Sequence, residues 1–124
     1  MMTMWSDLQD SLVAIDPGIE PGTWEAKFCF DPSLSLFKGH FPDNPLLPGV
    51  MQVEMAHLAM VRITGSNYQI IGVKKAKFTG QVFPGDQITV HLAAKDREDY
   101  LQVRAQLSVG EKKVGSVILD LEAS

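Results

Sequence analysis

The sequence predicts a single α+β domain in which one antiparallel sheet wraps around a buried helix. The main observation is a change in hydrophobic periodicity: apolar residues recur at every second position, then fill the run 50–63, then alternate again. The length of 124 residues fits one domain with a core of its own. Apolar residues make up 45% of the chain and charged residues 21%, which is typical of a soluble globular protein.

The first thirty residues predict a helix and then a strand. Residues 5–14 fit a short amphipathic helix that ends before the turn Asp16-Pro17-Gly18. Residues 24–30 alternate, with a tryptophan, an alanine and two phenylalanines at the even positions. This pattern is typical of a strand with one buried face.

The middle of the chain predicts a stiff loop that leads into the central helix. In residues 39–49, Pro42, Pro45 and Pro48 recur at every third position, and each proline fixes its own φ angle. The segment therefore suits an extended loop and neither a helix nor a central strand. Residues 50–63 are apolar on every side of a helical wheel, which is typical of a buried helix.

The remainder of the chain predicts about four antiparallel strands. Period-two alternation and turn residues place strands at 68–83, 88–92, 101–109 and 114–122, with turns at 84–86 and 110–113. A strand, a buried helix and a run of antiparallel strands correspond to the hotdog layout, which belongs to the α+β class.

The overall charge argues against one class of function. The formal net charge is −4, whereas nucleic-acid-binding domains are usually basic. No stretch reaches the roughly 20 apolar residues that a membrane-spanning helix needs, and the single cysteine, Cys29, fits a reducing compartment. We therefore expect a soluble, cytoplasmic protein that binds no nucleic acid and has no membrane span.

Three groups between residues 40 and 54 are suited to proton transfer and anion stabilisation. Glu54 lies within the apolar helix, where a carboxylate must find a partner or take up a proton; the alternative is an exposed stripe shared with Gln52 or His57. His40 sits beside the proline-rich loop, and histidine titrates near neutral pH. Gly49 begins the helix, and backbone N–H groups there can bind a polarised oxygen.

A base, an acid and an oxyanion site together are what the dehydration of a β-hydroxyacyl thioester requires. The base removes the proton on the α-carbon, the acid protonates the leaving hydroxyl, and an N–H donor stabilises the thioester oxygen. Taken singly, each residue has an ordinary alternative: a loop histidine, a surface glutamate or a turn glycine.

The segment GHFPDNPLLPGVMQVE, residues 39–54, resembles the active-site segment of the β-hydroxyacyl-acyl-carrier-protein dehydratases. Residues 72–90 also resemble a later strand-turn-strand segment of that family. The motif LLPGVMQVE is similar to the corresponding motif in the branch of dehydratases associated with aryl polyene pigment clusters. The resemblance implies a hotdog fold, His40 as base, Glu54 as acid and the N–H of Gly49 as carbonyl donor. It also implies a substrate carried by acyl carrier protein, a homodimer with shared active sites, and neither a metal nor a redox cofactor.

The sequence departs from the family at two places. Met55-Ala56-His57-Leu58 replaces the alanine-rich stretch that usually follows the acid, and the arginine- and tyrosine-bearing opening segment is missing. These differences bear on the identity of the acyl chain more than on the reaction. Two other functions stay open: a hotdog acyl thioesterase, and a non-catalytic subunit that holds an acyl chain.

Further candidate residues concern substrate binding and docking. Met51 and Met55 are candidates for an acyl channel, because methionine fills irregular apolar space, although both also suit a plain core. Lys74, Lys75 and Lys77 form a basic cluster that would attract an acidic carrier protein, or simply a solvated strand face. The three histidines lack the spacing of a zinc site.

Overall fold

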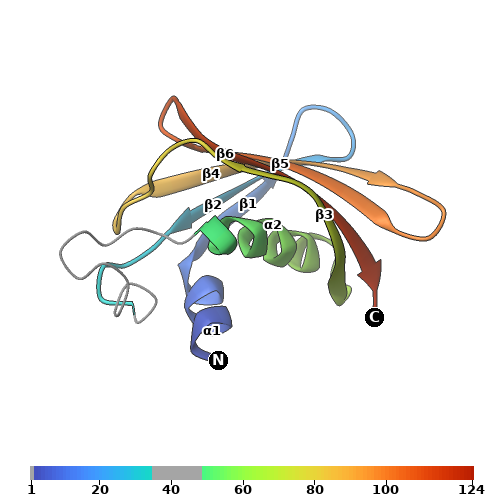
Figure 1. Ribbon diagram of the computed structural model, residues 1–124, viewed down its shortest axis with the longest axis horizontal. Helices are drawn as coiled ribbons and strands as arrows, with labels where there is room; N and C mark the ends of the chain where they lie inside the picture. Colours follow the sequence, from blue (N-terminus) through green and yellow to red (C-terminus); the bar gives the residue numbers. More distant parts are fainter. Residues whose placement is uncertain (1, 35–48) are drawn as a thin grey trace.

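The computed structural model describes residues 2–34 and 49–124, with side chains from residue 5 onward in those ranges. Two helices and six strands follow one another along the chain (Figure 1). In order they are α1 (Met2–Ser11), β1 (Leu12–Pro17), β2 (Thr23–Cys29), α2 (Gly49–Thr64), β3 (Tyr68–Phe78), β4 (Gln87–Asp96), β5 (Leu101–Val109) and β6 (Lys112–Ala123).

The six strands form one antiparallel sheet in the order β1-β2-β4-β5-β6-β3. The chain therefore crosses from β2 on one side of the sheet, through α2, to β3 at the far edge. Strand β6 then returns between β5 and β3. The predicted α+β hotdog layout is confirmed. The strand order places β3 at an edge of the sheet, where β6 is the only described strand that pairs with it.

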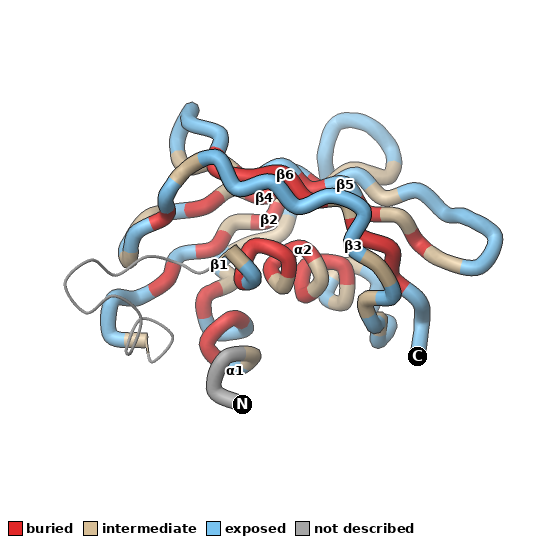
Figure 2. The backbone as a smooth tube through the Cα atoms, in the orientation of Figure 1, coloured by how far each residue is buried: buried red, intermediate tan, exposed pale blue. Residues whose placement is uncertain are grey.

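Helix α2 lies against the concave face of the curved sheet, and α1 packs beside it (Figure 1). Buried residues follow the sheet face toward α2, whereas the outer strand β3 is largely exposed (Figure 2). Eight of the 16 residues of α2 are buried, which explains why its sequence is apolar almost all round. The alternating residues of β4 and β5, such as Val90 and Val103, complete this core with no exposed surface.

Several predicted boundaries were wrong. The strand predicted at 88–92 extends over Gln87–Asp96, and the last two residues of the turn predicted at 110–113 belong to β6. Two other elements end earlier than predicted. The helix predicted at 5–14 ends at Ser11, because Leu12–Pro17 pairs with β2 as strand β1. The strand predicted at 68–83 ends at Phe78. In both places, pairing with a neighbouring strand decides the local conformation, and the pattern of a single segment does not reveal that pairing. The loop predicted at 39–49 lies outside the described residues except for Gly49, which begins α2.

Candidate functional site

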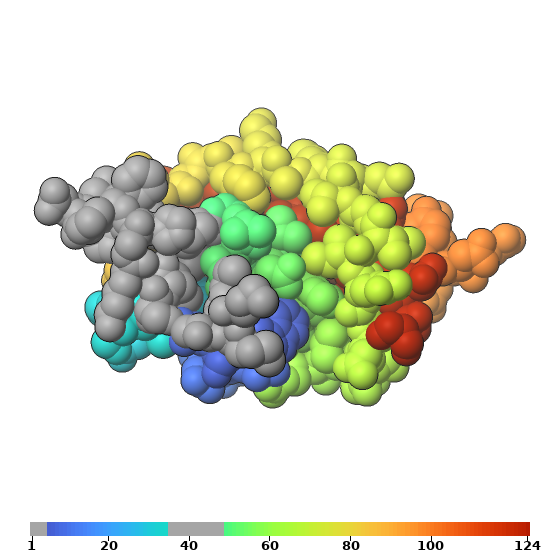
Figure 3. Space-filling model, turned by 60° about the horizontal axis from the view of Figure 1, so that its bottom comes forward, coloured from blue at the N-terminus to red at the C-terminus, as the bar shows by residue number. Residues whose placement is uncertain are grey.

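One side of α2 is not covered by the sheet. Val50, Glu54, His57 and Val61 follow one another at spacings of four, three and four residues, so they share one helix face. All four have some exposure, in contrast to the fully buried Met51 and Met55. In Figure 3 the surface of α2 is visible between α1 and β3. The predicted acid Glu54 therefore lies on an accessible stripe of an otherwise buried helix.

Glu54 is paired with the histidine one turn further along the same helix. The Nδ1 atom of His57 lies 3.1 Å from Oε2 of Glu54, and the side chains are 14% and 29% exposed respectively. The other ring nitrogen, Nε2, lies 2.6 Å from the backbone oxygen of Tyr68 at the start of β3. The hydrogen bond to the Glu54 carboxylate is the main cause that raises the pKa of His57, and it outweighs the opposing effect of burial.

This pairing decides between the two environments that the sequence left open for Glu54. The exposed stripe contains His57 but not Gln52, which is 2% exposed and faces the sheet. The structure thus places Glu54 in the alternative environment, the exposed stripe shared with His57, and His57 is its partner there. Sequence spacing indicates that the two residues are neighbours, but the bond to Tyr68 joins residues eleven apart and has no signal in the sequence.

Gly49 lies at the first position of α2, and its backbone is close to the ring of Phe78 at the end of β3. A β-carbon at this glycine would lie 2.7 Å from Cε2 of that ring. The absence of a side chain thus lets the start of the helix approach the strand. The N–H groups of the first helical turn have no acceptor within the helix, which leaves them free to bind an oxygen of a substrate.

The other predicted site residues are placed as follows. His40 lies outside the described residues. Met51 and Met55 are fully buried in the core. Lys75 and Lys77 are exposed on β3, whereas the Nζ atom of Lys74 lies 3.5 Å from Oδ2 of the buried Asp120.

A second basic segment lies next to the lysines of β3. The N–H of Thr79 donates to the oxygen of Val114, and the Thr79 hydroxyl donates to the oxygen of Lys113. Lys112 and Lys113, both exposed, therefore lie at the same end of the sheet as Lys77 and Phe78. This neighbourhood was not predictable from the sequence pattern, because these lysines begin β6, more than thirty residues after the lysines of β3.

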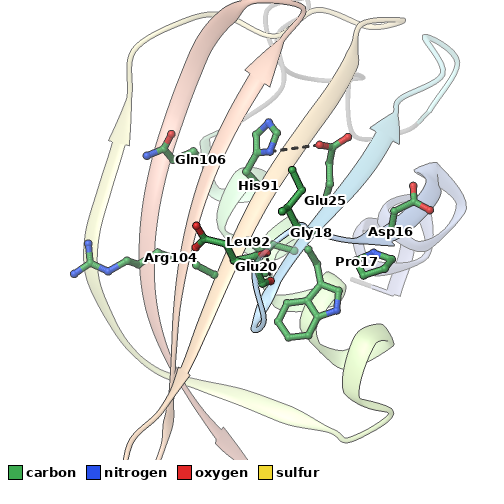
Figure 4. Close-up of a pocket in the computed structure, with 13 residues that line it drawn as sticks. Asp16, Pro17, Gly18, Glu20, Glu25, His91, Leu92, Arg104 and Gln106 are labelled. Atoms are coloured by element: carbon green, nitrogen blue, oxygen red, sulfur yellow. Dashed lines mark hydrogen bonds and ion pairs between the residues drawn. The ribbon is translucent and has the colours of Figure 1, made fainter.

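A groove of about 730 Å³ lies elsewhere, on the sheet surface away from α2 (Figure 4). Its lining includes Glu25 and His91, whose Oε2 and Nδ1 atoms are 3.6 Å apart, and Arg104. No residue of α2 contributes to it. The groove is therefore separate from the stripe that carries Glu54.

Comparison with known proteins identifies the family. The model of the ApeI-like family, described as the ApeI dehydratase, matches residues 17–116. The chain belongs to the ApeI-like dehydratase family. The match contains both segments on which the sequence resemblance rested, residues 39–54 and 72–90. The resemblance to the dehydratases is thereby confirmed.

Curated relatives point to the same group. A 3-hydroxyacyl-[acyl-carrier-protein] dehydratase FabZ of Oenococcus oeni is 36% identical over 94 residues, which are 68% of each chain. The FabZ of Clostridium beijerinckii is 31% identical over 67% of this chain. The chain spans 58% of the length of the Clostridium protein and 60% of that of a FabZ from Enterococcus faecalis.

Solved structures share the fold. A chain of the dehydratase heterocomplex ApeI:P from Xenorhabdus doucetiae superposes with a TM-score of 0.73 and 21% identity, over 90% of this chain and 96% of the other. The fluoroacetyl-CoA thioesterase FlK superposes with a TM-score of 0.70 and 17% identity, over 86% and 89%. Because a dehydratase and a thioesterase both match, the fold alone does not identify the reaction. Neither helix in the described part of the chain is long and apolar enough to cross a membrane.

Proposed function

We propose that this protein removes water from a 3-hydroxyacyl thioester carried by acyl carrier protein and forms a trans-2-enoyl thioester. Membership of the ApeI-like family and the likeness to FabZ support the reaction class. The observation that carries the proposal for this chain is Glu54. It is a carboxylate on the exposed stripe of the central helix, paired with a histidine and on the same helix as Gly49.

In the proposed reaction each group has one task. His40 takes the proton from the α-carbon, and Glu54 gives a proton to the β-hydroxyl, which leaves as water. The N–H of Gly49 stabilises the negative charge that develops on the thioester oxygen. The substrate loses one proton at carbon and gains one at oxygen, so the enzyme ends with an additional proton on His40 and one fewer at Glu54.

A homodimer would complete this site. The outer edge of β3 is eleven residues long and pairs with no described strand on that side, and Ile71 and Val73 on it are 49% and 50% exposed. Val50, on the stripe of α2, is 57% exposed. A second copy pairing along β3 would cover these apolar side chains and satisfy the backbone groups of the edge. It would also bring a second His40-bearing segment to the molecule.

The lysines support a docking surface for the acidic carrier protein. Lys75 and Lys77 lie close to Phe78, which contacts the start of α2 at Gly49. Positive charge beside that point would guide an acidic partner toward the site. Lys74 contributes less to this field, because its ammonium group already faces Asp120.

The buried methionines of α2 offer a path for the acyl chain. Met51 and Met55 lie four residues apart and thus on one helix side, and both are fully buried. Methionine side chains rearrange at low cost, so they can admit an apolar chain. We propose that they line the acyl channel when substrate is bound.

The test is turnover of 3-hydroxyacyl-acyl carrier protein followed by mass spectrometry of the carrier-bound product. Loss of one water with the thioester intact is expected for the wild type, and a fall of about 10²–10⁴-fold is expected for His40→Ala and Glu54→Gln. His91→Ala and Glu111→Gln, which change exposed residues outside the proposed site, serve as matched controls. Release of a free acid would instead identify a thioesterase, and no turnover of any chain would favour the acyl-binding subunit.

A further inference from the structure

The ring of His57 is held from three sides. Its Nδ1 faces Glu54 in α2, and its Nε2 faces the backbone oxygen of Tyr68 in β3. The indole of Trp5 in α1 lies against it, with ring centroids 5.4 Å apart and planes inclined by 54°. Two side-chain torsions are thus fixed by partners on three different elements.

The contact with Tyr68 determines the position of one proton. A carbonyl oxygen accepts hydrogen bonds and cannot donate, so Nε2 must carry hydrogen at its 2.6 Å distance from that oxygen. The remaining nitrogen, Nδ1, then bears either a lone pair or a second hydrogen. Which of the two it bears depends on its partner, the carboxyl group of Glu54.

The contact with Glu54 requires one proton between the two groups. If the carboxyl is ionised, Nδ1 must donate, and His57 is an imidazolium. If His57 is neutral, its Nδ1 lone pair must accept hydrogen from a protonated Glu54. Without this proton, two lone pairs would face each other at 3.1 Å. The pair therefore holds one shared proton, and the bond to Tyr68 excludes the tautomer that would let His57 satisfy Glu54 while neutral.

We propose that His57 is the positioning residue of the general acid, which fixes the Oε2 side of Glu54 and supplies the proton that Glu54 passes to the leaving hydroxyl. This inference rests on the proposed dehydratase function. Holding Oε2 leaves Oε1 to meet the substrate. The proton count is conserved: the pair loses one proton to the hydroxyl, His40 gains one from the α-carbon, and exchange with solvent restores both.

A shared proton explains how a glutamate can act as an acid near neutral pH. An isolated glutamate with a pKa of about 4.3 is almost entirely ionised at pH 7 and is a poor proton donor. The pair keeps its proton to higher pH, because the carboxylate beside His57 raises the pKa of the imidazole. The loss of activity as the pH rises would then reflect the loss of the shared proton from the His57–Glu54 pair, and not the ionisation of an isolated carboxyl group.

Other charged groups near His57 have little part in this effect. Glu54 is the charged group that acts on the His57 pKa. The remaining titratable residues on the three elements that hold the ring are Asp7 and Asp10 on α1, Arg62 on α2, and Tyr68, Lys74, Lys75 and Lys77 on β3.

The first test measures the protonation of His57 in the protein without any substrate. Long-range ¹H–¹⁵N spectra of the wild-type protein report which ring nitrogens of His57 carry hydrogen as the pH is raised. We expect both to be protonated at pH 6, and Nε2 to keep its hydrogen after the ring becomes neutral. A neutral ring with hydrogen on Nδ1, or titration like that of a free histidine, would overturn the inference.

The second test compares the pH dependence of kcat/KM for the wild type, His57→Asn and the control His91→Asn. Asparagine can place an N–H donor near Glu54 but cannot hold a titrating proton. For His57→Asn we expect the alkaline limb to move to lower pH, so that activity at pH 8 falls about 10- to 100-fold more than at pH 6. The control, in which an exposed histidine on the outer sheet face changes, should keep the wild-type profile.

The outcomes separate this inference from the proposed function. Wild-type turnover with an unchanged pH profile in His57→Asn would overturn the role of His57 and leave the dehydratase intact. An equal loss at every pH would show a structural role and would also overturn it. No turnover by the wild type would contradict both the dehydratase and the role of His57 in it, whatever the spectra show.

Discussion

The pairing of His57 with Glu54 makes the stability of the fold depend on pH in a direction that the structure fixes. The pKa of His57 is raised in the folded protein above its ordinary value of 6.5. The unfolded chain therefore releases this proton at lower pH than the folded chain does. The stabilisation is fully present below pH 6.5 and is lost as the pH rises through the folded pKa of His57.

The magnitude follows from one charge-assisted hydrogen bond. Such bonds contribute about 1.5–3 kcal/mol. The 29% exposure of Glu54 lowers this contribution to about 1–1.5 kcal/mol, because solvent screens the charges. For a chain of 124 residues, this corresponds to roughly 3–6 °C in Tm. We expect the Tm of wild type to exceed that of His57→Asn by that much more at pH 6 than at pH 9.

The assay is thermal unfolding by circular dichroism at both pH values, with His91→Asn as the matched control. Loss of packing against Trp5 lowers the Tm of His57→Asn equally at both pH values, so the difference between them isolates the charge. A Tm difference between wild type and variant that is the same at pH 6 and pH 9, or larger at pH 9, would refute the reasoning.

Three further predictions concern the core, the sheet edge and the docking surface. Gly115→Ala should lower the free energy of unfolding by about 1–3 kcal/mol in urea titrations, because a β-carbon there would collide with the buried carboxamide of Gln52. Val73→Lys should shift sedimentation toward the monomer, because it places charge on the exposed edge of β3 proposed to pair with a second copy. Lys75→Glu with Lys77→Glu should raise KM for a carrier-bound substrate several-fold at low salt and leave a small thioester substrate unaffected. Unchanged unfolding of Gly115→Ala would contradict the first prediction, and an intact dimer of Val73→Lys would contradict the second. An unchanged KM of the double lysine variant for the carrier-bound substrate would contradict the third.

The sequence predicted those parts of the fold in which hydrophobic periodicity alone decides the structure. The helix predicted at 50–63 is α2, and the alternation at 101–109 is β5, because burial on one or on all sides leaves a direct pattern. Strand β1 was missed, since Leu12–Pro17 becomes a strand only through its pairing with β2. The order of β6 between β5 and β3 likewise depends on contacts between distant segments.

The candidate site was predictable to the extent that it is local in the chain. The positions of Glu54 and Gly49 on one helix follow from the sequence pattern, and the structure confirms their placement there. The fixation of His57 was not predictable, because it depends on a backbone oxygen in β3 and an indole in α1. A histidine three residues after a glutamate is a neighbour in any helix, and only the third contact determines where its proton lies.

The likeness to both a dehydratase and a thioesterase is informative about what this fold provides. Both kinds of reaction act on a thioester, and N–H groups such as those of the first turn of α2 can stabilise a developing negative charge on its carbonyl oxygen. The reactions differ in what acts next: hydrolysis needs an activated water at the carbonyl carbon, whereas dehydration needs a proton donor at the β-hydroxyl. A carboxyl group that shares one proton with an imidazole fixed by Tyr68 is suited to donating that proton. The pairing of Glu54 with His57 on the stripe of α2 therefore supports the proposed dehydration, on a fold that a dehydratase and a thioesterase share.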